Sequence, residues 1–259
     1  MWDAFISLMV NILLYIYDFV GNDFGLAIIL FTILVRLATY PLNAQQVKQT
    51  KAMQNLQNSK KWQDIQKKYK DDKEKLSQEQ MKVYKEMGVN PFGSCLPTII
   101  QFPIIIGLYQ AIIRSLAVTP LQLLNLSKHI SNGADLIPLN NIFLWMDLSL
   151  PEKDFVLSIG GFDLSIAGYS IPFLAIVVVI TSYLQTKLMT PASTNPSDQG
   201  AQMSKAMGLY MPIFMGWLAY SFSSGLALYF VVSNLATIIQ YALMGKLDWK
   251  NILPQRAKS

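Results

Sequence analysis

The sequence predicts an all-α polytopic membrane protein, and three observations support that prediction. Of the 259 residues, 52% are hydrophobic and 14% are charged, whereas about 25% of residues are charged in soluble domains. The apolar residues gather in runs that approach the roughly 20 residues a helix needs to cross a bilayer. Lysines are concentrated in some of the loops between these runs and are scarce in others.

Five apolar runs are expected to form transmembrane helices. Prolines within or beside them are expected to kink or start the helices, which a membrane bundle tolerates when neighbouring groups satisfy the freed carbonyls. The predicted spans are residues 23–43, 91–118, 169–189, 207–222 and 225–244, and the prolines are Pro97, Pro103, Pro172 and Pro212.

Residues 1–22 are predicted to form an amphipathic helix in the membrane interface. Asp3, Ser7 and Asn11 recur every four residues, and Asp18 falls near the same face, a pattern typical of an interfacial helix. A sixth spanning helix is the alternative. The stretch has neither the basic residues of a secretory signal nor a cysteine that could carry a lipid anchor.

The distribution of lysine and arginine predicts the orientation. The 44–90 segment and the 245–259 tail are basic, whereas the 119–168 loop holds more acidic than basic residues. Four spans separate the two basic segments, so both are expected in the cytoplasm, together with the 190–206 loop. The N-terminus is then outside the cell and the C-terminus inside.

The 44–90 segment is predicted to form a mobile hairpin of two helices joined near Lys70–Lys73. Asp72 is placed to cap the second helix and Gly88 to end it. The apolar faces are sparse, so the hairpin is expected to be exposed and to catch substrates or partners. The alternative is a solvated charge run that only sets topology.

Polar residues within the predicted spans lie between the bilayer midplane and the cytoplasm. At 1.5 Å per residue, Arg36 lies about 18 Å from Phe24 and about 9 Å from Leu42. Neither the apolar run from Phe24 to Leu42 nor any of the other four spans contains an acidic residue. A shared depth on several helices predicts a hydrophilic groove that opens to the cytoplasm and is closed on the outer side. The candidate groove residues are Arg36, Thr32, Gln101, Gln185, Asn234 and Gln240.

Two alternatives remain open for these residues. The stem of Arg36 could carry its charge to the inner interface by snorkelling. Gln101, Gln185 and Asn234 could form interhelical hydrogen bonds, which are common and modest in strength.

The string "NPFGSCLPTIIQFPIIIGLYQAI" at residues 90–112 resembles the YidC family of membrane-protein insertases. Further similarities are the arginine of "ILVRLATYPL", the basic "MQNLQ…KKYKDD" hairpin, "FLWMDLS" at 143–149 and "GLALYFVVSNLATIIQ" at 225–240. Together they cover nearly the whole chain in order. The resemblance implies five helices around a groove open to cytoplasm and lipid, in a bacterial cell membrane.

The resemblance also implies a function without covalent chemistry. Arg36 and its polar neighbours would attract polar or acidic tails of nascent membrane proteins with one or two spans, and the groove would release their apolar segments into lipid. The Sec translocon and the ribosome are further candidate partners, although the short tail after Met244 argues against strong ribosome tethering. No cofactor, metal or nucleic acid is expected.

Two other classes of function were weighed. An intramembrane hydrolase needs a nucleophile and a base within hydrogen-bond reach, but the single histidine, His129, is in the predicted outer loop and Cys95 begins a span without one. The protein is therefore not expected to be an enzyme. A small-solute or ion transporter would place charged sites near the midplane, often in repeated halves, and the sequence shows no repeat.

Overall fold

The computed structural model describes residues 2–57, 59–69, 72–88, 96–116, 139–152, 172–189 and 199–245, together with short strands at 158–159, 162–163, 165–166 and 169–170. The predictions for Cys95, His129, the tail from residue 246 and much of the 119–168 and 190–206 loops fall outside these residues. The described helices are α1 (Trp2–Phe19), α2 (Phe24–Ala38), α3 (Tyr40–Gln57), α4 (Lys60–Lys68), α5 (Lys73–Glu86), α6 (Leu96–Leu116), α8 (Phe173–Met189), α9 (Gln199–Ser221) and α10 (Ser224–Leu243).

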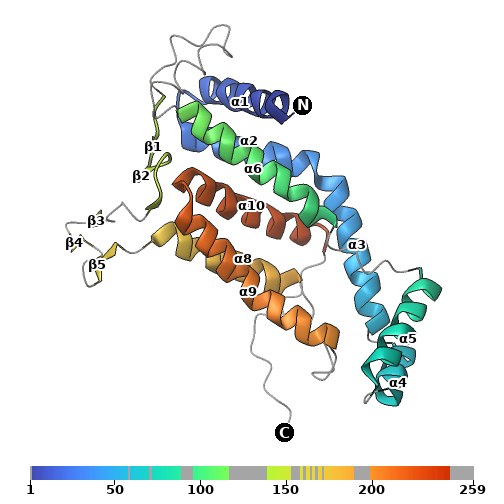
Figure 1. The fold of residues 1–259 in the computed structure, drawn as a ribbon. Helices are drawn as coiled ribbons and strands as arrows, with labels where there is room; N and C mark the ends of the chain where they lie inside the picture. The colour runs from blue at the N-terminus through green and yellow to red at the C-terminus, as the bar shows by residue number, and fades with distance from the viewer. Residues whose placement is uncertain are drawn as a thin grey trace.

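The bundle is organised around α10, which contacts α2, α6, α8 and α9. Helix α9 packs against α8, and α1 packs against α2 and α6. Figure 1 shows these helices running side by side, with α4 and α5 set apart beyond α3. The mostly helical fold agrees with the predicted fold class, whereas five spans around a groove remain a proposal.

Length and composition alone identify fewer spans than the sequence analysis expected. Two described helices, α1 and α10, are long and apolar enough to cross a membrane, and α8 is apolar but shorter. Helices α2 and α3 pass the same test as a pair, bent by 57° at the break between them. A bent pair of this kind is either one broken span or a re-entrant loop.

The helix boundaries follow local chemistry. Asp23 caps α2 by accepting a 2.9 Å hydrogen bond from the backbone N–H of Leu26. Pro103 and Pro212 lie inside α6 and α9. Several predicted span limits differ from the helices, and α2 ends at Ala38, short of the predicted limit at residue 43. Helix α8 begins after Pro172, because residues 169–170 form a strand, and α9 begins at Gln199, so polar turns precede its apolar part.

Helix α1 has three distinct faces. Its buried face packs on the bundle, a second face exposes Leu8, Ile12, Tyr15 and Phe19, and the polar residues fall on a third. Asp3 forms an ion pair with Arg114 near the end of α6, and the hydroxyl of Tyr17 accepts a 3.0 Å bond from the N–H of Asn140. One face toward protein, one toward lipid and one toward water suits a helix at a membrane interface.

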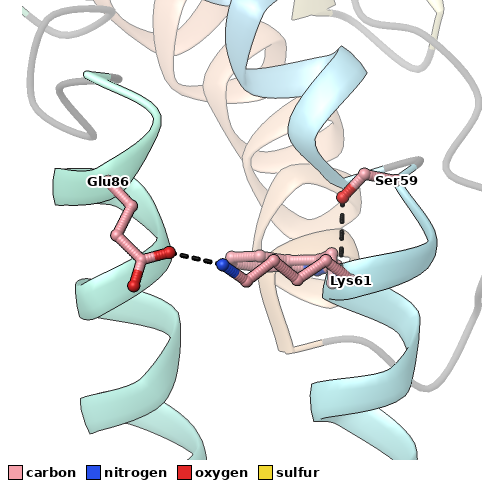
Figure 2. Close-up of polar contacts among 4 residues, drawn as sticks. Ser59, Lys61 and Glu86 are labelled. Carbon is pink, nitrogen blue, oxygen red and sulfur yellow. Dashed lines mark hydrogen bonds and ion pairs between the residues drawn. The ribbon is translucent and has the colours of Figure 1, made fainter.

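Among the described residues of the basic 44–90 segment, the end of α3 and the whole of α4 occupy the place of the first predicted helix, so the prediction of a single helix there was wrong. Helix α3 ends at Gln57, and a new helix, α4, begins at Lys60. The hydroxyl oxygen of Ser59 caps α4 by accepting a 3.3 Å hydrogen bond from the backbone N–H of Trp62. A small core of Leu56, Trp62 and Val83 joins α4 to α5, with the Trp62 and Tyr84 rings 5.1 Å apart. Figure 2 shows Lys61 reaching across to an ion pair with Glu86.

The predicted ends of α5 are confirmed. Asp72 accepts a 3.1 Å bond from the N–H of Lys75, and this bond is the main reason why the pKa of the Asp72 carboxyl is lowered. Gly88, at φ 63°, follows the last residues of the helix, where a left-handed conformation ends many helices.

Among the described residues, three two-stranded antiparallel hairpins interrupt the helical fold, and the all-α prediction missed them. They are β1–β2 (Ile142–Phe143 with Met146–Asp147), β3–β4 (Ser158–Ile159 with Phe162–Asp163) and β5–β6 (Ser165–Ile166 with Tyr169–Ser170). Each strand has two residues, too few to show an alternating pattern in the sequence.

Candidate functional site

Helix α10 carries a stripe of polar side chains along one face. Tyr229, Ser233, Thr237 and Gln240 are spaced by four, four and three residues, and all four are buried. Side chains at this spacing lie above one another on a helix. Of these four residues only Gln240 was predicted to line the groove, although the spacing of the other three was itself a signal for them.

Arg36 of α2 reaches this stripe through Ser233. Its Nε donates a 2.9 Å hydrogen bond to the Ser233 hydroxyl oxygen, and Nη2 donates to the same atom. The backbone carbonyl of Arg36 accepts a 3.1 Å bond from the Gln240 side chain. Two residues of α10 thus hold the end of α2 that carries the cation.

No carboxylate pairs with Arg36 among the residues that the structure describes. The ion pairs found there involve Lys61, Lys75, Lys82 and Arg114, all on exposed side chains. A guanidinium has five N–H donors, and the only described side chain that accepts from Arg36 is the neutral hydroxyl of Ser233. The half-buried cation therefore has no described counter-ion.

Gln101 connects α6 to the stripe by donating a hydrogen bond to the hydroxyl of Tyr229. Asn234 connects α8 to α10, because its amide donates to the hydroxyls of Thr181 at 3.1 Å and Ser182 at 2.8 Å. Both side chains therefore make the interhelical hydrogen bonds that were considered as an alternative role for them. Asn43 extends the network with a 3.4 Å bond to Gln240.

Two of the predicted groove residues are not part of this network within the described structure. Thr32 is fully buried and its hydroxyl donates to the carbonyl of Ile28 at 2.6 Å, one turn back on its own helix. Gln185 is half-buried one turn beyond Thr181, and it has no hydrogen bond to the network formed by the described side chains. We refer to Arg36, Gln101, Tyr229, Ser233, Asn234 and Gln240 as the polar cluster.

The opposite end of the bundle is apolar and closed by the 140–152 segment. The core there includes Phe24, Ile28, Leu108, Ile112 and Leu226, all nearly inaccessible to solvent. The N–H groups of Ser224 and Gly225 donate to the carbonyls of Leu150 at 2.9 Å and Leu148 at 3.1 Å. Polar side chains therefore gather toward the α3 end of the bundle, and apolar packing fills the end beside β1 and β2.

Glu152 fixes the start of α8 at this closed end. Its two carboxylate oxygens accept 2.7 Å bonds from the N–H of Leu174, and one accepts a 3.2 Å bond from Ala175. Burial raises the pKa of this carboxyl, while the two backbone donors act in the opposite direction. The sequence analysis gave no role to this residue.

Comparison with known proteins identifies the family of the chain. Residues 15–250 match the family model described as 60Kd inner membrane protein. The chain belongs to this family. The similarity to the YidC family that the sequence motifs indicated is thereby confirmed.

Several relatives in the family carry the name membrane protein insertase. The chain is 36% identical to the membrane protein insertase YidC of Oceanobacillus iheyensis, over 87% of this chain and 76% of that one. It is 35% identical to the membrane protein insertase MisCA of Bacillus subtilis, over 99% of this chain and 84% of that one. It is 32% identical to the YidC of Pelodictyon phaeoclathratiforme, over 92% of this chain but 35% of that longer one.

The motifs that carried the resemblance occupy separate parts of the bundle. Arg36 of "ILVRLATYPL" ends α2, "FLWMDLS" forms most of the β1–β2 hairpin, and "GLALYFVVSNLATIIQ" is α10 with its polar stripe. The beginning of "NPFGSCLP" precedes the described part of α6. The motif on α10 therefore contains four residues of the polar cluster, namely Tyr229, Ser233, Asn234 and Gln240.

Proposed function

We propose that the protein is a membrane-protein insertase, and that the polar cluster receives the hydrophilic tails of its substrates. The observation that carries the proposal is Arg36, a half-buried cation whose described side-chain partner is the neutral hydroxyl of Ser233. A cation with no described counter-ion attracts an acidic group that arrives from outside the protein. The relatives' names support the same function.

The membrane arrangement belongs to this proposal. Helices α2, α6, α8, α9 and α10 cross the bilayer, α1 lies in the outer interface, and α4 and α5 lie in the cytoplasm with the C-terminus. The cluster is then open toward the cytoplasm, and the apolar core beside β1 and β2 closes the outer half. The lysines around α3 to α5 support the assignment of that end to the cytoplasm under the positive-inside rule.

The substrates are nascent membrane proteins with one or two spans and acidic tails. A tail that enters the cluster loses part of its hydration shell, and interactions with Arg36 and with the amides and hydroxyls around it replace the lost water. Burial of the substrate's own apolar helix in lipid then drives release, and the membrane potential adds about 2.3 kcal/mol per charge per 100 mV. The step requires no cofactor. The Sec translocon and the ribosome are proposed partners.

A small-solute or ion transporter is the second candidate, and the packing argues against it. A channel needs a continuous polar route to both sides, and a transporter needs an outer end that can open, whereas Phe24, Ile28, Leu108 and Leu226 are packed in the core at the other end of the bundle.

Purified protein in liposomes distinguishes the two functions. Vesicles are given a single-span substrate with an acidic tail, and protection of the tail from added protease is measured beside ion flux. The insertase account expects protected tail in proportion to the protein and flux no greater than in empty vesicles. Ion flux without tail protection would contradict it and support a transporter.

A further inference from the structure

The β1–β2 hairpin has an apolar tip exposed on the surface of the protein. Ile142, Leu144 and Trp145 are 60%, 70% and 38% exposed. Leu144 adopts φ 54°, a left-handed conformation that costs most L-residues about 1–2 kcal/mol. Tight hairpin turns of this kind favour asparagine, aspartate or glycine, so turn formation alone does not account for a leucine here.

The other face of the hairpin fixes the tip on the bundle. Met146 and Leu148 are buried in the main core. Phe143 packs so closely on Gly25, in the first turn of α2, that a β-carbon at Gly25 would overlap its ring. The tip therefore has a defined position at the end of the bundle.

The only charged group in the hairpin is turned away from the tip. One oxygen of Asp147 accepts hydrogen bonds from the Asn141 amide at 2.9 Å and from the N–H and hydroxyl of Ser149 at 2.9 and 2.5 Å. These bonds hold the carboxylate at the base of the hairpin. Its tip, from Ile142 to Met146, contains no charged residue.

The tip continues a lipid-facing surface. The Trp145 ring packs edge-on against Phe173, with centroids 5.9 Å apart. Phe173 begins α8 and is 38% exposed, and Ile176 and Ile180, one and two turns further on, are 43% and 58% exposed. In a membrane protein this exposed row lies against lipid, and tryptophan is enriched where such surfaces meet water.

We propose that the β1–β2 tip inserts into the bilayer leaflet beside the first turns of α2, α8 and α10. Ile142, Leu144 and Trp145 form a lipid anchor that sets the depth of this end of the bundle. The 140–152 segment is hydrogen-bonded to the start of α10 and, through Glu152, to the start of α8. The anchor thus holds two helix ends at one level.

The test uses a nitroxide label at Ile142 in a Cys95→Ser background, in vesicles of phosphatidylethanolamine and phosphatidylglycerol. Collisions with oxygen, which prefers lipid, are compared with collisions with a water-soluble nickel chelate. A label at Ile180 serves as the lipid reference and one at Lys75 as the water reference. The proposal expects the Ile142 label to favour oxygen, between the references but closer to Ile180. A ratio equal to that at Lys75 would overturn it.

Substitutions at Leu144 separate anchoring from turn geometry. Asparagine tolerates the positive φ at position 144, so the thermal stability of Leu144→Asn in detergent is expected to hold or rise. Because the variant loses an apolar anchor residue, the label at Ile142 is expected to collide with the nickel chelate several-fold more often. Leu144→Met, the apolar control, is expected to keep the parent depth. An unchanged depth in Leu144→Asn would overturn the proposal. A label shielded from both reagents would also overturn it, because protein rather than lipid would then cover the tip.

Discussion

The guanidinium of Arg36 is held by the hydroxyl of Ser233. A carboxylate in the same place would neutralise its charge, whereas the hydroxyl does not. Ser233 accepts from two nitrogens of the guanidinium, which orients the side chain toward α10 and leaves its charge uncompensated by any described residue. The guanidinium is bonded to a buried serine of a neighbouring helix, whereas simple snorkelling would direct it to the membrane interface. In the function proposed above, orientation by a neutral group keeps the charge available for a substrate.

Ser233→Ala is expected to separate stability from charge. The variant leaves the guanidinium without its described acceptor, so the free energy of unfolding should fall by about 1–2 kcal/mol. Insertion should persist, because Arg36 remains. Unfolding in detergent and insertion into vesicles measure the two effects, with Ser233→Thr as the control that retains a hydroxyl. Loss of insertion in a variant that remains folded would mean that the hydroxyl itself contacts substrate.

The structure shows the contacts of the predicted groove residues, whereas their depth in the membrane stays a prediction. The side chains of Arg36, Gln101, Asn234 and Gln240 each form a hydrogen bond to a neighbouring helix. Thr32 has a suitable depth, but a threonine in a helix satisfies itself on the carbonyl four residues back, so its hydroxyl need not face a groove. Ser233 and Tyr229 were missed because a serine or tyrosine in an apolar helix also suits ordinary packing.

Single side chains determine where several elements begin. Glu152 caps α8 from a distant position in the sequence. Ser59 caps α4 and so separates it from α3 in the basic 44–90 segment. The sequence predicted Asp72 as a cap because it directly precedes a helical pattern. It could not predict Glu152, which is separated from α8 by a long stretch of chain, nor the break at Ser59, which lies in a polar run without periodicity.

The Glu152 cap is expected to make stability depend on pH. Because burial raises the folded-state pKa above the unfolded value, the folded protein binds this proton more tightly. The stabilising contribution is therefore complete at acidic pH and is lost as the pH rises through the folded-state pKa. Glu152→Gln keeps an acceptor oxygen but cannot titrate.

Thermal unfolding in detergent, from about pH 4 to about pH 7, brackets the ordinary glutamate range. The parent should lose stability across this range relative to Glu152→Gln. Glu152→Ala removes both acceptors and should cost about 1–3 kcal/mol at any pH in the range. Identical slopes in the parent and in Glu152→Gln would show that this carboxyl does not titrate differently on folding.

The basic hairpin is expected to be a separable element. Its core of Leu56, Trp62 and Val83 is distinct from the main core, so deletion of about residues 55–83 should leave the bundle folded. Insertion should fall severalfold if the hairpin catches substrates. Trp62→Ala, which disrupts only the small core, should cause a smaller loss.

Protease protection of a substrate tail measures insertion by the deletion variant, and the midpoint of thermal unfolding reports on the bundle. If insertion by the folded deletion variant equals that of the parent, the segment acts only as a topology signal.

Across the whole molecule, polar and apolar groups separate along the bundle axis. The apolar end is closed by the 140–152 segment, and the polar cluster lies toward α3 on helices gathered around α10 (Figure 1). Composition and motifs predicted a helical membrane protein of this family. They did not predict that α2 and α10 lie side by side, because the Arg36–Ser233 contact joins residues 197 positions apart. The strands were missed because they are short and lie between spans.

The central claim is that the charge of Arg36 attracts substrate tails. The most direct measurement is insertion of two single-span substrates, one with an acidic tail and one with a neutral tail, by the parent, Arg36→Lys and Arg36→Ala at equal amounts of folded protein. Opposite charges about 4 Å apart attract by about 4 kcal/mol at an effective dielectric constant near 20. Arg36→Ala should therefore insert the acidic tail at least about tenfold less well, with a smaller effect on the neutral tail. Arg36→Lys retains a point charge without the planar fork and should keep much of the activity. Equal insertion of both substrates by Arg36→Ala and by the parent would contradict the account.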